Sequence, residues 1–318
     1  MTGQEGRRTL CLLRCLRLAL VVLVTCAVAL FFLIVPFRAL LPAYPVPARG
    51  EGELRIHFLS VGQGDATAVE FPDGEVLLID GGDGSFSAND ALVRYLKGLQ
   101  MTALSVLSTH ADADHFAGLC EVLTVFDVEK VYLPVLRDAP EYERFLAAVR
   151  EEGCPAEELT RYDVISHPSG AYLVCISPYP IGETDENDAS TVLYLSYQGV
   201  NALFCADIGA ARERRLLSEL ALGEDIFDSG EYRVRLAKTD ILKVAHHGSD
   251  ASSGEEWLQM LSPSAAVISC GAGNSYRHPA GGTLSRLSSV GAEVYRTDEL
   301  GHILITVSGG SYTVSSEF

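Results

Sequence analysis

The sequence predicts a layered α/β fold, with β-sheets packed together and helices on their outer faces. Short apolar segments with the alternation typical of strands recur from residue 54 to residue 314, and segments with helical spacing lie between them. They form two strand-rich halves, and stacked sheets covered by helices bury such halves best. The body after residue 52 has about 265 residues, which is ample for one core.

The first half begins with strands and leads to a helix. A Pro72-Asp73-Gly74 turn joins two apolar runs, which is typical of a hairpin. Farther on, Leu92, Leu96 and Leu99 recur at helical spacing. The predicted strands of this half are 54–59, 66–71, 75–80 and 104–108, and the predicted helix is 89–99.

The second half repeats this alternation. Its predicted strands are 172–177, 191–197, 202–206, 241–245 and 265–269, and its predicted helices are 211–220, 254–261 and 283–289. At the end, residues 302–314 predict a hairpin that turns at Gly309-Gly310.

An uncharged apolar run precedes this body. Residues 18–37 are long enough to form a helix across a bilayer, and arginines at 7, 8, 14 and 17 place the N-terminus in the cytoplasm. We therefore expect a cytoplasmic segment 1–17, a transmembrane helix 18–37, a proline-rich linker 38–52 and an extracytoplasmic domain 53–318. A cleaved signal peptide is the alternative, although no clean small-residue cleavage site follows the run.

The composition limits the partners of the domain. The chain has a formal net charge of −18, and the part after residue 50 holds 18 basic and 41 acidic residues. Such a surface repels polyanions at long range, which counts against a non-specific nucleic-acid binder, but bound cations can invert the potential at one site. The eight cysteines are scattered without a CxxC pair, so we expect neither a disulfide framework nor a zinc ribbon.

Four side chains of the metal-binding type lie within six positions after the 104–108 strand. They are His110, Asp112, Asp114 and His115, and imidazole nitrogen together with carboxylate oxygen suits zinc, manganese or iron. A solvated loop with Asp114 as a helix cap would explain one aspartate, but not the two flanking histidines. We therefore predict a metal site at the end of this strand.

Three later strands also end in residues that can bind metals. The 202–206 strand leads to Asp207, and the 241–245 strand leads to His246 and His247. The 265–269 strand leads to a glycine-rich loop with Asn274 and His278. Each pattern alone could be a helix cap or a loop contact, but their recurrence predicts that distant strand ends converge on one site.

Together these motifs resemble the metallo-β-lactamase superfamily and, within it, the hydrolase domain of the ComEC/Rec2 competence proteins. The similarity spans residues 54 to about 300, and the motifs stand in the family's order. They are 58–66 (FLSVGQGDA), 78–82 (LIDGG), 110–115 (HADADH), 187–193 (NDASTVL), 206–208 (ADI), 242–249 (LKVAHHGS) and 274–279 (NSYRHP).

The resemblance implies that 53–318 is a metallo-β-lactamase-like hydrolase domain, an αββα sandwich with two divalent metal ions at the sheet edge. Asp207 would bridge the ions, and one histidine of the pair at 246 and 247 would complete a site while the other contacts the substrate. Asp65 and Asp80 would hold the ligand loops. The implied metal ligands are His110, Asp112, Asp114, His115, Asp207, His246 and His247, and residues beside the ligands or the substrate are Asp65, Asp80, Asn187, Asp188 and Asn274.

The chain departs from the superfamily's common HxHxDH signature at Asp112, where a second histidine usually stands. An anionic oxygen makes the site harder, which weakens the preference for zinc over manganese. Zinc is expected first, and manganese is the alternative.

The interval between the HADADH motif and Asp207 contains no clear further ligand. His167, in a turn-like setting, and Asn187 or Asp188 are the candidates. Lys243 is expected on the strand surface, and the histidines at 57 and 302 are expected in structural positions.

The resemblance implies a single-pass, membrane-anchored, extracytoplasmic metal-dependent hydrolase, a phosphodiesterase or nuclease of the ComEC/Rec2 type that uses a metal-bound hydroxide. Asp114 would orient the attacking water, and His278 would donate a hydrogen bond to the charge that develops on the substrate. The expected partners are a phosphodiester (DNA, a nucleotide or a cell-surface polymer) and the membrane through the N-terminal helix; no protein partner is predicted.

Two alternatives stay open at this point. A lactone or β-lactam hydrolase would be expected to carry the full HxHxDH set, so Asp112 argues against it. A non-catalytic module for DNA uptake would be expected to lack metal ligands and to carry a basic face, whereas this body is acidic.

Overall fold

The computed structural model describes residues 16–26, 28, 37–135, 139–178, 187–220 and 226–316. By its contacts the chain divides into two units, residues 1–41 and residues 42–318. In the first unit, residues 16–26 are helical and Phe37–Leu40 forms the 3-10 helix η1. Among the described residues, no helix combines the length and the apolar content needed to span a bilayer. The predicted span 18–37 lies partly outside them, at residues 27 and 29–36, and stays a prediction.

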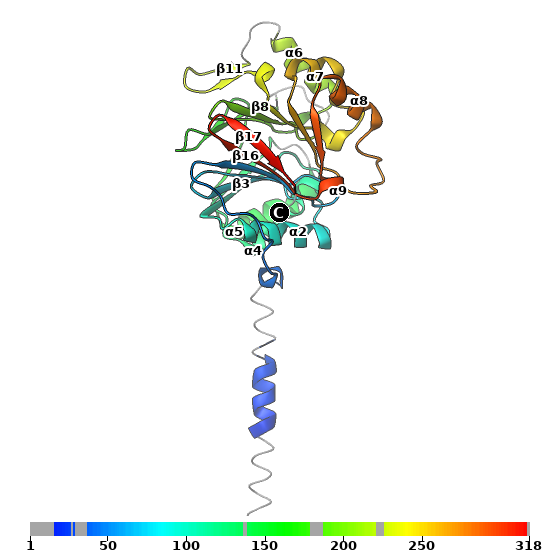
Figure 1. The fold of residues 1–318 in the computed structure, drawn as a ribbon. Coiled ribbons are helices and arrows are strands. Elements are labelled where there is room, and N and C mark those ends of the chain that lie inside the picture. Colours follow the sequence, from blue (N-terminus) through cyan, green and yellow to red (C-terminus); the bar gives the residue numbers. More distant parts are fainter. Residues whose placement is uncertain are drawn as a thin grey trace, which may run out of the picture. The chain divides into compact units, whose positions relative to one another are not determined.

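The second unit stacks four layers, helices–sheet–sheet–helices, in the αββα order (Figure 1). The helices on one outer face are α2 (Phe86–Gly98), α4 (Leu119–Val125) and α5 (Glu143–Glu152), and those on the other are α6 (Ala210–Leu220), α7 (Glu255–Leu261) and α8 (Gly281–Ser289). The shorter helices are α3 (Ala113–Phe116), α9 (Thr297–Leu300) and the 3-10 turns η2 (Pro140–Tyr142), η3 (Asn187–Ala189), η4 (Leu236–Lys238) and η5 (Ala245–Gly248).

The first sheet is mixed. Its strands are β1 (Leu54–Phe58), β2 (Thr67–Glu70), β3 (Glu75–Ile79), β4 (Ala103–Leu107), β5 (Lys130–Leu133), β6 (Ala156–Glu158), β16 (Ile303–Ser308) and β17 (Ser311–Ser315). They form eight strands in the order β17-β16-β1-β2-β3-β4-β5-β6. The pairs from β3 to β6 are parallel, so β3 and β4 end at the same edge of the sheet.

The second sheet is also mixed. Its strands are β7 (Val164–Ser166), β8 (Tyr172–Ser177), β9 (Val192–Tyr197), β10 (Val200–Phe204), β13 (Ile241–Lys243), β14 (Ala265–Ile268) and β15 (Glu293–Arg296). The order is β15-β14-β13-β10-β9-β8-β7, and β11 (Phe227–Asp228) pairs separately with β12 (Arg233–Val234). Because β10, β13 and β14 are parallel, the segments that follow them leave from one edge.

Strand β1 shows how the layers are built. All five of its residues are buried, because both faces of the sheet are covered. Leu54, Ile56 and Phe58 face the core between the sheets, where Phe58 lies 6.4 Å from Phe204, ring centre to ring centre. The alternate residues of β1 therefore point toward the helix layer, as the two-residue period of a strand requires.

Residues 42–50, inside the predicted linker 38–52, belong to the second unit and pack on its other elements. The Tyr44 amide donates to the carbonyl of Arg94 on α2 (2.8 Å), and the Tyr44 ring stacks on Tyr95 at 5.3 Å. The Arg55 guanidinium donates to the carbonyl of Pro47 (2.7 Å). This part of the segment is therefore docked on the domain.

Candidate metal centre

The loop after β4 holds its histidines and aspartates at different depths. His110 is 3% exposed and His115 is fully buried, and their rings lie 4.1 Å apart. The Asp112 and Asp114 side chains are 40% and 34% exposed. His110 Nε2 lies 3.6 Å from Asp112 Oδ2. The two imidazoles are thus buried, and the two carboxylates are partly exposed to solvent.

Asp207, from the second sheet, meets this loop from the first. It follows β10, and its Oδ1 lies 3.3 Å from His115 Nε2. Its Oδ2 lies 3.5 Å from His247 Nε2 and 3.8 Å from His246 Nε2. One buried carboxylate therefore faces three imidazoles, and it is shared by two of the groups of side chains that could surround a cation.

Turn η5 places the paired histidines differently. His247 is 2% exposed, with Nε2 3.3 Å from Asp114 Oδ2, whereas the His246 side chain is 30% exposed. Both have left-handed backbone conformations, with φ of 49° and 52°. For non-glycine residues this costs about 1–3 kcal/mol each, and such strain gathers at functional sites. The strained turn brings both Nε2 atoms within 4 Å of Asp207.

Asp80 fixes the buried histidine of the first loop. His115 Nδ1 lies 2.8 Å from Asp80 Oδ2, so Nε2 faces Asp207. Asp80 also accepts hydrogen bonds from the amide and the hydroxyl of Thr109, at 2.8 and 2.7 Å. A carboxylate behind a histidine orients the ring and raises its basicity as a metal ligand.

His247 has a similar support, which includes a residue that the sequence interpretation misplaced. His247 Nδ1 lies 3.2 Å from Asp65 Oδ1 and 3.1 Å from the Ser269 carbonyl. Lys243, predicted on the strand surface, is instead 2% exposed and donates from Nζ to Asp65 Oδ2 (2.6 Å) and to the Val244 carbonyl (3.1 Å). That prediction was wrong, because β13 is covered on both faces.

A glycine lets the loop that carries Asp65 approach the first ligand loop. Gly64 has a φ of +152°, and a Cβ built there would lie 2.4 Å from the carbonyl oxygen of Asp114. The Asp65 amide donates to that same oxygen at 3.2 Å. A side chain at position 64 would therefore push α3 and its ligands away.

The charges of the buried groups are strongly coupled. Burial opposes protonation of His115, yet Asp207 and Asp80 outweigh it and hold its pKa well above the ordinary value. Burial is likewise outweighed at His247, where Asp207 and Asp65 raise the pKa to about 10. Burial would raise the pKa of Asp207, but the neighbouring histidines hold it well below the ordinary value. The buried carboxylates therefore favour positive charge beside them, which either protons on the histidines or metal cations can supply.

Several buried atoms at the centre lack hydrogen-bond partners. Buried polar atoms are nearly always paired, so a cluster of unpaired ones indicates a missing ligand. Nitrogen and carboxylate oxygen donors in this arrangement fit a divalent metal cation. The unpaired atoms include Nε2 of His110, His115 and His247 and Oδ1 of Asp65 and Asp207.

The loop after β14 forms the rim. Asn274 bonds its own loop, donating to the His278 carbonyl (2.6 Å) and accepting from the His278 amide (2.9 Å). This places the His278 ring 5.8 Å from that of His246 and 6.4 Å from that of His247. Burial and the two neighbouring histidines lower the pKa of His278. Tyr276, 68% exposed, lies beside it at 5.7 Å.

The candidates for a further metal ligand lie in different parts of the structure. His167 Nε2 faces Asp73 and Glu75, at the other end of β3 from Asp80, so His167 is not part of this centre. Asp188 Oδ1 accepts from the Gly209 amide at 2.9 Å and so braces the loop that follows Asp207.

Asn187 is the first residue of η3 and precedes Asp188, which bonds the Gly209 amide. Among the described residues, no group of three or more acidic, histidine or cysteine side chains close enough to bind one ion includes position 188.

The chain is similar to known proteins over most of its length. A family model described as the metallo-beta-lactamase superfamily matches residues 59–272. The chain is 32% identical to ComE operon protein 3 of Bacillus subtilis over 271 residues, covering 80% of this chain and 33% of that protein. It is 24% identical to recombination protein 2 of Haemophilus influenzae, covering 79% and 28%. It is 27% identical to competence protein ComA of Neisseria gonorrhoeae, covering 92% and 39%.

The chain thus spans about a third of the length of the curated relatives it matches. Among solved structures, a mutant of the CmlA β-hydroxylase superposes with a TM-score of 0.51 at 13% identity, covering 83% of this chain and 54% of that one. At this identity the likeness concerns the fold alone.

Proposed function

The chain belongs to the metallo-β-lactamase superfamily, and on this premise we propose that it is a membrane-anchored, extracytoplasmic phosphodiesterase. The main support is the convergence of three buried, unpartnered imidazole nitrogens with Asp207, beside carboxylates open to solvent. Such a donor set fits a metal-dependent hydrolase. The anchor rests on the apolar run 18–37 and the arginines before it.

The ligands favour a phosphodiester over a lactam or a lactone. Where the superfamily signature has a second histidine, this chain presents Asp112, with its carboxylate 40% exposed near His110. Two divalent cations held here, zinc first and manganese as the alternative, would lower the pKa of a water molecule and polarise phosphoryl oxygens. The additional anionic oxygen suits harder cations, which commonly act on phosphate.

The chain's own residues around the centre have distinct roles. The Asp114 carboxylate, 34% exposed and 3.3 Å from His247 Nε2, would orient the attacking water. His278, whose pKa is lowered, is neutral at pH 7 and can donate one ring N–H to a substrate oxygen. Asn274 fixes the backbone of His278 and so its approach to the centre.

Tyr276 favours substrates that carry a base. Its ring is 68% exposed and lies beside His278, at the rim of the centre. An exposed aromatic ring next to the cleavage site can stack on a nucleobase, which is worth about 1–3 kcal/mol per base. A nucleotide or nucleic-acid diester would gain this contact, and a cell-surface polymer without aromatic groups would not.

The test is turnover by the purified full chain, stripped with chelator and reloaded with Zn²⁺ or Mn²⁺. We expect cleavage of bis(p-nitrophenyl) phosphate and of thymidine 5′-(p-nitrophenyl phosphate), loss on chelation and recovery on reloading. Asp207→Ala should lose activity and bound metal, whereas Asp127→Ala, at an exposed position, should keep both. Faster cleavage of a β-lactam or lactone, or DNA binding without turnover, would overturn the proposal.

A further inference from the structure

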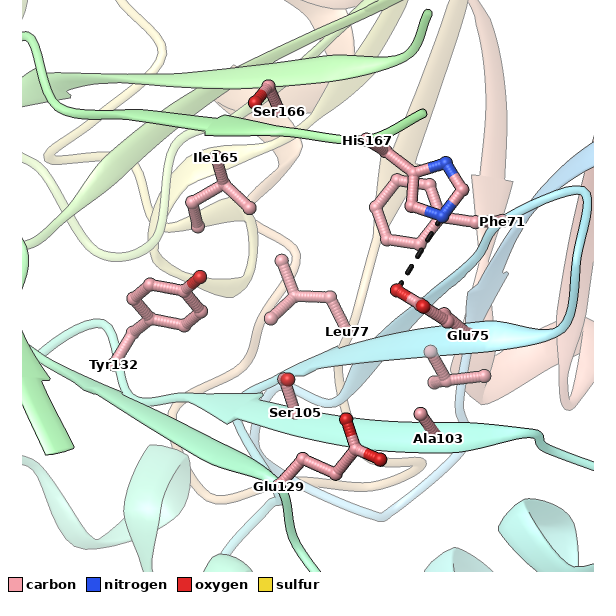
Figure 2. A pocket seen from close by; sticks show the side chains of 11 residues that line it. Phe71, Glu75, Leu77, Ala103, Ser105, Glu129, Tyr132, Ile165, Ser166 and His167 are labelled. Atoms are coloured by element: carbon pink, nitrogen blue, oxygen red, sulfur yellow. Dashed lines mark ion pairs between the residues drawn. The ribbon is translucent and has the colours of Figure 1, made fainter. Parts of the chain in front are cut away.

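A second group of side chains that could bind a metal lies away from the metal centre. There, a turn of the first sheet lies next to a turn of the second sheet. Asp73 and Glu75 belong to the β2–β3 turn and the start of β3 in the first sheet. His167 follows β7 in the second sheet. Figure 2 shows His167 above Phe71, with its ring nitrogen directed at Glu75, beside a pocket of about 120 Å³.

The three side chains converge as ligands of one cation do. His167 Nε2 lies 3.1 Å from Asp73 Oδ2 and 3.6 Å from Glu75 Oε2, and all three donor atoms lie within 4.8 Å of one another. The His167 side chain is 5% exposed, yet its Nε2 has no hydrogen-bond partner. The carboxylates are 50% and 52% exposed, so a cation can reach the group from solvent.

The His167 ring is held in one orientation. It stacks on Phe71 with the ring centres 4.2 Å apart and the planes at 7°. Its Nδ1 lies 2.8 Å from the Ser169 hydroxyl oxygen. The Ser169 amide donates to Nδ1 at 3.2 Å, so without a metal the ring proton is on Nε2. A cation at Nε2 would move the proton to Nδ1, and Ser169 Oγ would then accept it, as metal-binding histidines usually donate their other N–H to an oxygen.

We propose that Asp73, Glu75 and His167 bind a divalent transition-metal cation of the zinc type, which fastens the two sheets together at this end. One imidazole nitrogen and two carboxylate oxygens suit such a cation, and water would complete its coordination. A hydrogen bond between His167 and Asp73 alone would leave Glu75 without a role. In addition, the 3.1 Å contact with Asp73 is not a hydrogen bond, since Nε2 is without a hydrogen-bond partner. The proposal is independent of the function of the main centre.

The experiment counts Zn²⁺ bound per purified full chain by equilibrium dialysis and elemental analysis. Glu75→Gln and His167→Gln remove one ligand each with little change in size. Glu129→Gln is the matched control, because Glu129 lines the same pocket but is not one of the three converging residues. We expect both ligand variants to bind one equivalent fewer than the unmodified chain and the control to bind the same number, with diesterase activity unchanged in all three.

Two further readouts do not depend on stoichiometry. Saturating Zn²⁺ at about 100 times its Kd should raise Tm by about 5 °C more in the unmodified chain than in Glu75→Gln. Binding at Nε2 leaves the ring proton on Nδ1, whereas without the cation the Ser169 amide, 3.2 Å from Nδ1, favours the proton on Nε2. Nitrogen-15 NMR of His167 should report this change of tautomer. Equal stoichiometry in the unmodified chain and both ligand variants, or an unchanged tautomer, would overturn the proposal.

Discussion

Two buried groups of charged residues in this domain differ in how their atoms are paired. On the helix side of the first sheet, Glu70 is fully buried and accepts from Arg49 (2.5 Å), Arg55 (2.6 Å) and the His57 ring (3.0 Å). The other nitrogen of His57 lies 3.0 Å from the Tyr95 hydroxyl. Within the described residues, no side-chain atom of this network is buried without a partner.

The metal centre shows the opposite. Nε2 of His110, His115 and His247 and Oδ1 of Asp207 are buried and unpartnered. A complete polar network makes a fold more rigid, whereas an incomplete one is costly unless a ligand completes it. Charge and burial alone therefore do not distinguish a structural cluster from a binding site; the count of unpartnered atoms does.

The largest expected effect is on stability, at the complete network. Glu70→Gln leaves the Arg55 guanidinium buried with no opposing charge, and breaking a buried ion pair costs about 3–5 kcal/mol. Urea unfolding should show this loss, while kcat/KM per folded molecule stays unchanged. Glu158→Gln on the exposed strand β6 should change neither quantity. A Glu70 variant that is stable but inactive would contradict the assignment of the Glu70 network to stability and of the metal centre to activity.

Next in size is the loss of a ligand at the incomplete network. His115→Ala removes the nitrogen that faces Asp207. Changes to the partners behind metal ligands already cost about 10–100-fold in affinity or activity, so we expect at least a 100-fold loss of diesterase kcat/KM. Metal analysis should find fewer cations per chain. His302→Ala, outside the centre, is the comparison, and equal losses from both changes would show that the effect is general destabilisation.

A smaller effect is expected where a complete ion pair supports the centre. Lys243→Met removes the partner of Asp65 but no predicted ligand. We expect metal affinity to fall by about 10-fold with the number of bound cations unchanged, because His247 is less firmly oriented. Titration calorimetry measures both quantities. Lys130→Met, at a partly exposed pair with Glu157, should leave affinity unaltered; an equal fall there would refute the positioning role.

The last expected effect is a pH dependence of the stability of the chelated chain. In the folded state the pKa of His247 is raised from 6.5 to about 10. Its protonation therefore stabilises the fold fully below pH 6.5, and this contribution is lost as the pH rises toward 10. Thermal unfolding in chelator should show Tm falling over this interval, and less so for His247→Gln. In the metal-loaded chain a cation replaces the proton, so Tm should fall less; parallel profiles would argue against replacement.

The sequence was most informative where strands end in unusual residues. The HADADH loop, Asp207 and the histidine pair each follow an apolar run, and the structure brings them within 4 Å of one another. Parallel strands that end at one edge explain this convergence. Helix α2 was predicted from residue 89 but begins at Phe86, because the Ser85 hydroxyl accepts from the Ala88 amide and caps the first turn.

The region between residues 119 and 158 was harder to read. Strand β6 has the sequence Ala-Glu-Glu and is exposed throughout, so it carries no apolar alternation. Helix α5 buries only Phe145 and Val149, which is too few positions for a clear helical period. Lys243 was misread for a related reason: its ion pair with Asp65 joins residues 178 positions apart, and no local pattern records such a contact.

One aspartate serves more than one set of donors at the centre, since Asp207 belongs both with His110 and His115 and with Asp65 and His247. Two cations bound at these two groups would therefore not bind independently. The first cation would neutralise part of the Asp207 charge on which the second depends, so we expect a two-step binding isotherm with unequal constants. Half-filled molecules would then dominate at one equivalent of cation, where a statistical mixture would hold empty and full ones as well.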